Sequence, residues 1–244
     1  LDLTLTTNAY LLPQQARDLK YAGLQRVTIS LDTLDDDIFK QMNGRGFPVQ
    51  RVLDGIEKAA EVGLAPIKIN AVVQKGVNDH SLVELARYFK GTGHIVRFIE
   101  YMDVGNRNGW KWDHVVPAAE IIKQIDAELP LEPADSNYRG EVANRYRYKD
   151  GTGEIGVIAS VTMPFCGDCT RARLSTDGKL YTCLFASSGV DLRDQMRAGA
   201  TDEELNNRIQ AIWGIRSDRY SEERTELAPI QNPRQKVEMY HIGG

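Results

Sequence analysis

Apolar and polar residues alternate along several short stretches in the first half of the chain. Successive side chains of a β-strand point to opposite faces, so alternation with a period of two predicts strands. Strands are predicted over residues 1–9, 26–32, 66–73 and 94–102.

The longer stretches between these strands have the end signals of helices. Pro13 stands near the start of the first stretch and Gly23 just past its end, and Gly63 closes another stretch. Strands that alternate with helices predict a parallel sheet or barrel. Helices are predicted over residues 12–23, 35–42, 49–63 and 79–91.

The predicted strands each have one polar face, which is unusual for such a fold. A parallel sheet covered by helices on both faces reads as a near-continuous apolar run, and a filled barrel interior is mostly apolar. Thr6, Ser30 and Lys68 stand on the polar faces, whereas Arg97 shares its face with Ile99 and fits less cleanly. We expect a barrel with helices outside and a polar, occupied interior. An open sheet whose polar face meets solvent is the alternative.

The pattern changes in the second half of the chain. A helix that begins at Pro117 is followed by short strand-like stretches and later by an amphipathic helix. We therefore expect two domains, which comprise residues 1–115 and 116–244. The elements predicted in the second half are helices over 117–129 and 202–215 and strands within 141–150 and 154–162.

Composition and charge limit the class of protein. The 244 residues are 42% hydrophobic and 26% charged, as in ordinary globular proteins. No apolar run approaches the roughly 20 residues that cross a bilayer, and no charged-then-apolar leader opens the chain. We expect a cytoplasmic protein without a membrane partner. The net charge of −4 argues against a broad nucleic-acid surface, which needs a basic excess.

All three cysteines lie in one stretch, FCGDCTRARLSTDGKLYTCLF, at Cys166, Cys169 and Cys183. An odd number of closely spaced cysteines does not suggest a disulfide framework. The C-x-x-C pair places two thiolates on one tight turn, as ligands of iron or zinc.

A hairpin is predicted between the second and third cysteines. Asp177-Gly178 is a strong signal for a two-residue turn. Counting outward from that turn sets Ala172 opposite Cys183 and returns Cys183 to the side of Cys169.

Three thiolates leave the fourth ligand of the site unexplained. Structural zinc takes four ligands, and the four histidines of the chain are not at finger-like spacing. An iron–sulfur cluster held by three thiolates would leave one iron open to a substrate. We favour such a cluster, with zinc and ordinary thiols as the alternatives.

Arg171 and Arg173 share one face of the predicted hairpin strand. Two guanidinium groups so close together repel each other, so an anionic partner is expected. Arginine suits phosphate because it can form two parallel hydrogen bonds. A surface ion pair with a carboxylate is the alternative.

The cysteine stretch, together with RFIEYMDVGNRNGW, TTNA, ISLDTLD, QKGVND and the terminal GG, resembles the MoaA-type GTP 3′,8-cyclases. These are radical S-adenosylmethionine (SAM) enzymes of molybdenum-cofactor biosynthesis. The resemblance spans essentially the whole chain, although Ala9 stands where the family usually has glycine. It implies an α/β fold: an incomplete barrel of the triosephosphate-isomerase type, and a C-terminal α+β domain with an iron–sulfur cluster.

The resemblance also implies roles for individual residues. The three cysteines would hold a [4Fe–4S] cluster whose open iron contacts the guanine of GTP. Arg97 lines the active site, and the terminal Gly243 and Gly244 reach into it. A frayed tail and a ubiquitin-like conjugation tail are the alternatives for the two glycines. The implied GTP ligands are Thr6, Lys68, Arg171, Ala172 and Arg173, and the implied SAM ligands are Ser30 and Met102.

The implied reaction begins with reductive cleavage of SAM at a first [4Fe–4S] cluster. The resulting radical takes hydrogen from ribose C3′ of GTP, and the carbon radical attacks C8 of guanine. The product is (8S)-3′,8-cyclo-7,8-dihydro-GTP.

The first cluster needs a C-x3-C-x2-C motif, and the chain has no cysteine beyond the three in the quoted stretch. We therefore expect a piece that lacks the N-terminal part and does not cleave SAM alone.

The resemblance implies several partners besides GTP. They are a reductant such as flavodoxin or ferredoxin, a cyclic pyranopterin monophosphate synthase that takes the product, and a second copy of the chain in a homodimer. Two other functions remain as alternatives: a non-catalytic nucleotide or iron–sulfur sensing module, and another radical SAM enzyme with an auxiliary cluster.

Overall fold

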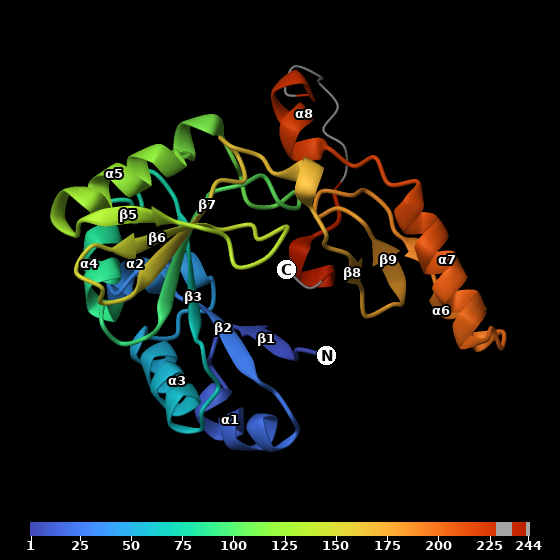
Figure 1. Cartoon of the computed structure of the whole chain (residues 1–244), viewed down its shortest axis with the longest axis horizontal. Coiled ribbons are helices and arrows are strands. Elements are labelled where there is room, and N and C mark those ends of the chain that lie inside the picture. The colour runs from blue at the N-terminus through green and yellow to red at the C-terminus, as the bar shows by residue number, and fades with distance from the viewer. Residues whose placement is uncertain (228–235, 243–244) are drawn as a thin grey trace. The chain divides into compact units, whose positions relative to one another are not determined.

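The computed structural model describes residues 1–227 and 236–242. The chain divides into two compact units, each of which is described by itself (Figure 1). Unit 1 comprises Leu1–Tyr101 and Trp112–Met163, and unit 2 comprises Met102–Lys111 and Pro164–Gly244. The sheet of unit 1 runs across the predicted domain division at residues 115 and 116.

Unit 1 is an α/β structure built on one sheet of seven strands in the order β1-β2-β3-β4-β7-β6-β5. Strands β1 to β4 and β7 are parallel, and β6 and β5 are antiparallel additions at one side. The strands are β1 (Thr4–Thr7), β2 (Arg26–Ser30), β3 (Lys68–Val73), β4 (Ile95–Glu100), β5 (Leu131–Ala134), β6 (Asn144–Tyr148) and β7 (Glu154–Ile158).

The helices of unit 1 form where the sequence supplies their end signals. Asp35 caps α2 by accepting hydrogen bonds from the backbone N–H groups of Asp37 and Ile38. Gly44 ends the same helix with φ of 63°, a conformation that favours glycine. The helices are α1 (Leu12–Tyr21), α2 (Asp36–Asn43), α3 (Gln50–Glu61), α4 (Leu82–Phe89), α5 (Ala118–Glu128) and the 3-10 turn η1 (Trp112–His114).

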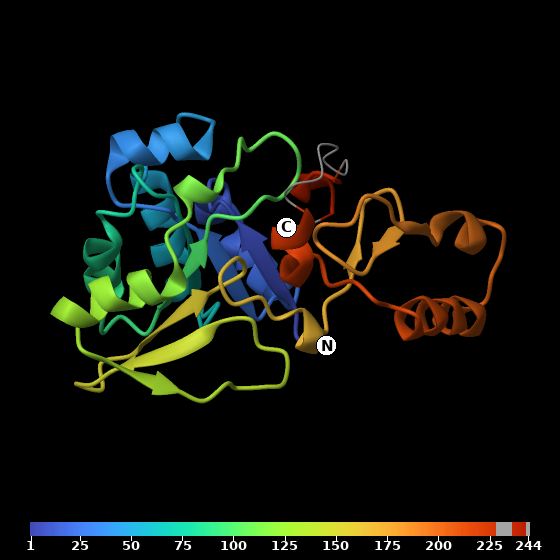
Figure 2. The ribbon, with the colours of Figure 1, turned by 90° about the horizontal axis from the view of Figure 1, so that it is seen from above.

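The helices of unit 1 lie along one face of its sheet (Figures 1 and 2), and the core lies between that face and the helices. Apolar side chains of β2, β3, β4 and β7 pack there against α1, α3, α4 and α5. Burial of these side chains removes apolar surface from water and holds the helices to the sheet. Its largest fully buried members on the strands are Ile29, Ile69, Phe98 and Ile155.

The predicted strands and helices of the first half are confirmed; most are shorter than the sequence indicated, and α2 is shifted by one residue. The described strands form an open sheet with β1 and β5 at its edges. Strand β5 was not predicted, and it contains Pro133, a residue that is disfavoured within central strands. The structure tolerates Pro133 because β5 is an edge strand.

The described part of unit 2 contains a small antiparallel sheet in the order β10-β9-β8 and the α-helices α6, α7 and α8. Thr201 and Glu204 form a reciprocal capping box at the start of α7. The elements are η2 (Cys166–Asp168), β8 (Arg173–Leu174), β9 (Lys179–Tyr181), β10 (Val190–Asp191), α6 (Arg193–Arg197), α7 (Asp202–Gly214), α8 (Tyr220–Leu227) and η3 (Met239–His241).

Candidate functional site

The face of the unit 1 sheet opposite the core carries polar side chains in two rows across the strands. In the first row Thr6 is in register with Thr28, and Thr28 with Lys68. In the second row Ser30 is in register with Asn70, and Asn70 with Arg97. Residues in register on parallel strands share a face, so four of the predicted site residues lie on one surface.

Arg97 is held across this surface by two neutral neighbours. Its Nε donates to Asn70 Oδ1 at 2.9 Å, and its Nη2 donates to Thr28 Oγ1 at 3.5 Å. Burial lowers the pKa of Arg97, but a guanidinium stays charged in proteins. A Cβ on Gly156 would lie 3.2 Å from Arg97 Cγ and 3.1 Å from Ala143 Cβ, so glycine there gives the arginine side chain room.

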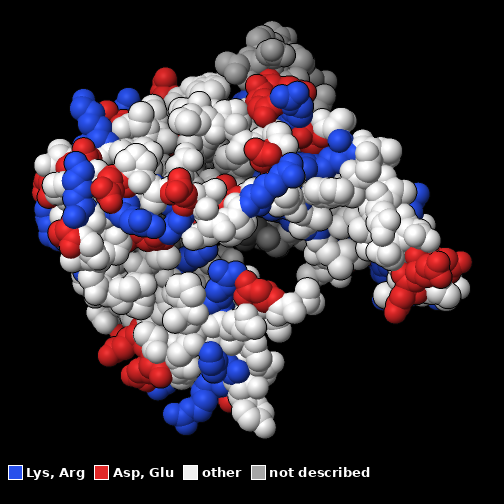
Figure 3. All heavy atoms as spheres, viewed as in Figure 1, with Lys and Arg blue, Asp and Glu red and all other residues white. Residues whose placement is uncertain are grey.

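Lys68 is a second partly buried cation on the same face. Burial lowers its pKa most, and the positive charges of Arg97 and Arg26 lower it further. In the part of the chain that the structure describes, neither Lys68 nor Arg97 forms an ion pair with a carboxylate. Two partly desolvated cations without a carboxylate partner favour an anionic ligand. Figure 3 shows acidic and basic residues intermixed over the visible face of unit 1, so the excess of positive charge at Lys68 and Arg97 is local.

The two residues that the resemblance implies for SAM lie in different units. Ser30 is the last residue of β2 and is partly buried. Met102 opens the loop of unit 2 that runs to Lys111, and its carbonyl oxygen accepts a hydrogen bond of 2.8 Å from Asn108 Nδ2.

The cysteine stretch begins with a 3-10 turn. Cys166 starts η2, and the N–H of Cys169 donates to the carbonyl of Cys166 at 3.2 Å, which closes the turn. All three cysteine side chains are partly buried and unbridged. The C-x-x-C pair thus occupies one tight turn, as its spacing predicts.

The predicted hairpin exists, but its register was wrong by one residue. Arg173 pairs with Tyr181 and Leu174 with Leu180, so the loop has three residues instead of two. Ser175 causes the shift, because its hydroxyl accepts a hydrogen bond from the N–H of Lys179 and donates to Asp177. A type I turn followed by glycine at φ of 80° suits this loop length.

Continuing the observed register past the paired residues would set Arg171 opposite Cys183. The prediction that Ala172 stands there was therefore wrong. Ala172 is exposed, and both flanking arginines are partly buried.

Arg171 lies directly against one of the three sulfur atoms. Its Nη2 and Nε donate to Cys169 Sγ at 3.1 Å and 3.3 Å. Burial alone would raise the pKa of the Cys169 thiol, but the hydrogen bonds and charge of Arg171 and the charge of Arg216 lower it below its usual value. Such a thiol becomes a thiolate, the form that binds metal, more readily.

Arg173 and Cys183 complete the electrostatics of this site. Burial and the neighbouring Arg171 lower the pKa of Arg173, whereas Cys183 and Cys169 oppose that shift. Burial raises the pKa of Cys183, and the charges of Asp218 and Cys166 add to the increase. These effects on one another's pKa indicate that the three thiols and Arg173 lie close together.

The donor set of this stretch fits an iron–sulfur cluster by its chemistry: three thiols with guanidinium groups beside them. Within residues 1–227 and 236–242, no group of three or more His, Cys, Asp or Glu side chains is gathered to hold one metal ion. A cubane cluster has four irons that each take their own ligand, so its thiolates need not converge on one point.

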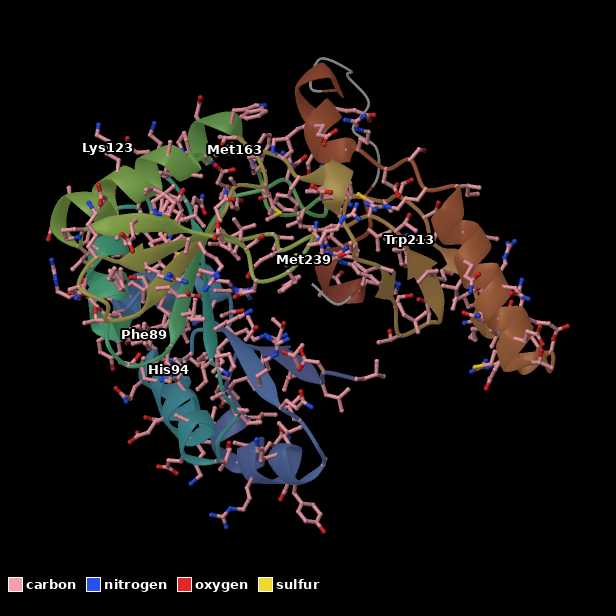
Figure 4. All side chains as sticks on the ribbon, in the orientation of Figure 1. Phe89, His94, Lys123, Met163, Trp213 and Met239 are labelled. Carbon is pink, nitrogen blue, oxygen red and sulfur yellow. The ribbon has the colours of Figure 1, made fainter. Side chains whose placement is uncertain are left out.

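Within the described residues, no histidine completes a metal-binding group with the cysteines. His241 Nε2 lies 3.3 Å from Asp177 Oδ1. His94 lies beside Phe89 at a pocket of about 500 Å³ between α3 and α4 (Figure 4), on the helical side of the unit 1 sheet. His80 and His114 also belong to unit 1.

Sequence reasoning did not single out Asn70, Thr28 or Asp32. Asn70 and Thr28 occupy the same alternating positions as Lys68 and Ser30, so the period of two places them on the polar faces as well, although it assigns them no role. Asp32 follows β2, and its Oδ1 accepts a hydrogen bond of 2.8 Å from the N–H of Val72. Burial raises the pKa of Asp32 to about 6, against the lowering effect of that bond.

Comparison with known proteins links both units to one enzyme family. Residues 1–89 match the Radical SAM superfamily, and residues 94–222 match Molybdenum Cofactor Synthesis C. The GTP 3′,8-cyclase of Acidothermus cellulolyticus is 50% identical over 265 residues, which cover 100% of this chain and 73% of that protein. The chain belongs to the GTP 3′,8-cyclase family.

Two further GTP 3′,8-cyclases give the same picture. The protein of Xanthomonas campestris pv. campestris is 49% identical, and that of Staphylococcus saprophyticus is 46% identical. Each match covers 100% of this chain, and 70% and 72% of the relatives respectively. The family resemblance expected from the sequence motifs is confirmed.

The fold agrees with this membership of the GTP 3′,8-cyclase family. A solved structure described as native anSMEcpe with bound AdoMet superposes with a TM-score of 0.51 at 15% identity. The match covers 83% of this chain and 56% of that one. This likeness concerns the fold alone, and with the family match it supports an α/β radical SAM fold. None of the described helices is long and apolar enough to span a membrane.

The terminal Gly243 and Gly244, which the resemblance places in the active site of GTP 3′,8-cyclases, lie outside the described residues.

Proposed function

We propose that this chain acts in the conversion of GTP to (8S)-3′,8-cyclo-7,8-dihydro-GTP, the first step of molybdenum-cofactor biosynthesis. The observation that carries this proposal is its 46 to 50% identity to curated GTP 3′,8-cyclases over its whole length. The two family matches, over residues 1–89 and 94–222, support the same function.

The second unit would hold a [4Fe–4S] cluster through Cys166, Cys169 and Cys183. The tight turn at η2 and the guanidinium of Arg171 against Cys169 Sγ support this assignment. A positive group beside a thiolate lowers the cost of its negative charge, and hydrogen bonds to sulfur also tune a cluster's potential. Three protein ligands would leave one iron for the guanine base of GTP.

Cations of both units would bind GTP. In unit 2, Arg173 is partly buried and forms no ion pair with a described carboxylate, and Arg171 and Ala172 adjoin it. In unit 1, Lys68 and Arg97 share the polar face with Thr6. A triphosphate would be the anionic partner of these arginines and the lysine.

SAM would be bound through Ser30 and Met102. When bound, SAM and a reduced [4Fe–4S] cluster supply the radical that removes hydrogen from ribose C3′. The residues of this chain would hold the ribose and base of GTP in a fixed geometry, so that C3′ and C8 can join. Arg97 would line the reacting site, and Gly243 and Gly244 would contribute to it.

Several finer features of the family stay with this proposal. We propose with it an incomplete barrel for residues 1–115, a cluster-bearing domain for residues 116–244, and a second cluster held by an N-terminal part of the full protein. A cytoplasmic location, a flavodoxin-like or ferredoxin-like reductant, a cyclic pyranopterin monophosphate synthase that takes the product, and a homodimer also belong here.

Calorimetric titration of GTP into the anaerobically reconstituted chain tests the binding part of the proposal. We expect one GTP per chain, and affinity that falls at least tenfold in Arg173→Ala because a charged hydrogen-bonding partner of phosphate is lost. Arg197→Ala, on the exposed end of α6, is the matched control and should bind GTP normally. A wild-type chain that loads iron but shows no heat with GTP would refute GTP as the ligand.

A further inference from the structure

A single carboxylate in unit 2 gathers two cations and a phenol from distant parts of the chain. Asp103 Oδ1 accepts from Arg224 Nε at 2.8 Å, and its Oδ2 accepts from Lys236 Nζ at 2.5 Å. The hydroxyl of Tyr220 donates to Oδ2 at 2.6 Å. Arg224 is 3% exposed and Lys236 is 11% exposed, so these ionic contacts are largely shielded from solvent.

Two aromatic rings help to balance the second positive charge. Phe185 and Tyr220 stack with their centroids 4.6 Å apart. The guanidinium of Arg224 lies 5.2 Å from the Phe185 centroid, and Lys236 Nζ lies 4.6 Å from that of Tyr220. Each cation lies within 6 Å of both ring centroids, so cation–π attraction to both rings stabilises a group with two cations and one carboxylate.

A second set of contacts fastens the segment 236–242 to the same loop. Asn106 Nδ2 donates to the carbonyl of Lys236 at 2.6 Å, and the N–H of Lys236 donates to Asn106 Oδ1 at 3.1 Å. The N–H of Asn106 donates to Glu238 Oε1 at 3.0 Å. Gly105 has φ of 64°, and a Cβ there would clash with the Glu238 carboxylate, so glycine allows this approach. Figure 4 labels Met239 in this segment.

The same group reaches the loop that carries the third cysteine. The N–H of Phe185 donates to Cys183 Sγ at 3.4 Å. The N–H of Ala186 donates to the Cys183 carbonyl at 3.3 Å, and the N–H of Val237 donates to the Ala186 carbonyl at 3.1 Å. Phe185 and Ala186 are therefore held by the aromatic stack and by the segment 236–242, and both residues bond to Cys183.

We propose that Asp103, Asn106, Arg224 and Lys236 form a clamp that positions Cys183. The clamp holds the segment 236–242 against residues 183–186 and fixes the Phe185 N–H on the sulfur. Backbone N–H bonds to thiolate ligands orient the ligands and tune the cluster potential, so the clamp residues would act on the cluster without touching it. The consequence for a cluster rests on the proposed function; the coupling between Asp103 and Cys183 does not.

The clamp is tested first in the metal-free chain. Asp103→Asn keeps the shape of the side chain but removes the charge shared by both cations. We expect faster amide hydrogen exchange at residues 183–187 and 236–242, and alkylation of the Cys183 thiol that is about tenfold faster, because local opening becomes more frequent. Alkylation of Cys169 should be unchanged. Glu222→Gln, which removes the partly buried carboxylate of α8 that pairs with Arg219 and not with the clamp, is the control.

Lys236→Met is the second variant, because it keeps the apolar stem and leaves the pair of Asp103 with Arg224. We expect Lys236→Met to produce the same changes in exchange and alkylation, so it tests the clamp even if Asp103→Asn does not fold. Faster exchange at 236–242 with unchanged Cys183 alkylation in a folded variant would overturn the coupling, as would no change at either place.

The reconstituted chain then separates the two proposals. We expect clamp variants to bind as much iron as the wild type but to show a shifted reduction potential. A wild-type chain that takes up no iron would contradict the proposed function while the metal-free results still decide the clamp. Normal iron content with an unchanged potential would overturn the clamp's action on the cluster.

Discussion

Arg97 Nε donates to Asn70 Oδ1 at 2.9 Å, across two neighbouring parallel strands of unit 1. The amide is neutral, so it orients the guanidinium without cancelling its charge. An aspartate at the same position would orient the group equally well but would compete with an anionic ligand. The pair thus holds a cation ready for a substrate with phosphate groups.

Replacement of Asn70 tests this relationship. In Asn70→Leu the guanidinium loses its acceptor, and we expect GTP affinity to fall about tenfold, or about 1.4 kcal/mol, with unchanged iron content. Asn70→Asp should also weaken GTP binding, because its negative charge would compete with the phosphates for Arg97. Gln124→Leu on the exposed face of α5 is the control for loss of an amide. Normal GTP affinity in both Asn70 variants would rule out this role of Arg97.

The contact between Arg171 and Cys169 makes a prediction about thiol reactivity. Because Arg171 lowers the pKa of the Cys169 thiol against the effect of burial, Arg171→Met should raise that pKa and leave less thiolate near pH 7. We expect alkylation of Cys169 in the metal-free chain to slow about three- to tenfold, as measured by peptide mass spectrometry across a pH series. Arg197→Met should leave the rate unchanged. A rate profile that does not move in Arg171→Met would show that the guanidinium does not stabilise the thiolate.

Asp32 should make the protein less stable as the pH rises. Its pKa is about 6 in the folded chain and near 3.8 when unfolded, so the folded state binds the proton more tightly. This contribution to stability is complete below about pH 4 and is lost as the pH passes 6. Asp32→Asn should therefore be more stable than the wild type at pH 8, by at most about 3 kcal/mol, and equally stable near pH 4.

Urea unfolding of both chains at pH 8, 6 and 4 measures this difference. Asp150→Asn is the opposite control, because its ion pair with Lys90 lowers the pKa of Asp150 to about 2. That variant should be slightly less stable than the wild type at pH 8. Equal stability of Asp32→Asn and the wild type at every pH would contradict a raised pKa of Asp32 in the folded chain.

Glu100 is fully buried and should be important for the stability of unit 1. Its carboxylate accepts hydrogen bonds from the N–H groups of Ala118, Val161 and Thr162, which tie the end of β4 to α5 and to the segment after β7. Glu100→Gln turns an amide NH2 toward these donors, so we expect a loss of about 3 kcal/mol in urea unfolding. Glu120→Gln, on the surface of α5, should change stability little; a comparable loss in both variants would contradict the assignment.

Local patterns in the sequence predicted the sheet of unit 1 well. Alternation with a period of two depends on neighbouring residues alone, so it located β1 to β4 and placed Thr6, Ser30 and Lys68 on one face. Arg97 was ambiguous because Ile99 shares its face. Pairing with Asn70 resolves it, and pairing is a property of the folded sheet.

Contacts between distant residues could not be predicted from the pattern. Asp103 and Lys236 are 133 residues apart in sequence, and nothing in either neighbourhood indicates the other. The hairpin register failed for a smaller reason, because the Ser175 hydroxyl outweighed the two-residue turn signal of Asp177-Gly178. The assignment of the three cysteines as cluster ligands rests on the family motifs and stays a prediction.

Anaerobic reconstitution with iron-57 and sulfide, followed by Mössbauer spectroscopy with and without GTP, tests the central claim most directly. We predict about four irons per chain and one iron whose signal changes when GTP is added. Substitution of Cys166, Cys169 or Cys183 by alanine should abolish the cluster signal. Tight zinc without iron uptake, or a cluster whose spectrum ignores GTP, would contradict a cluster with an open iron for substrate.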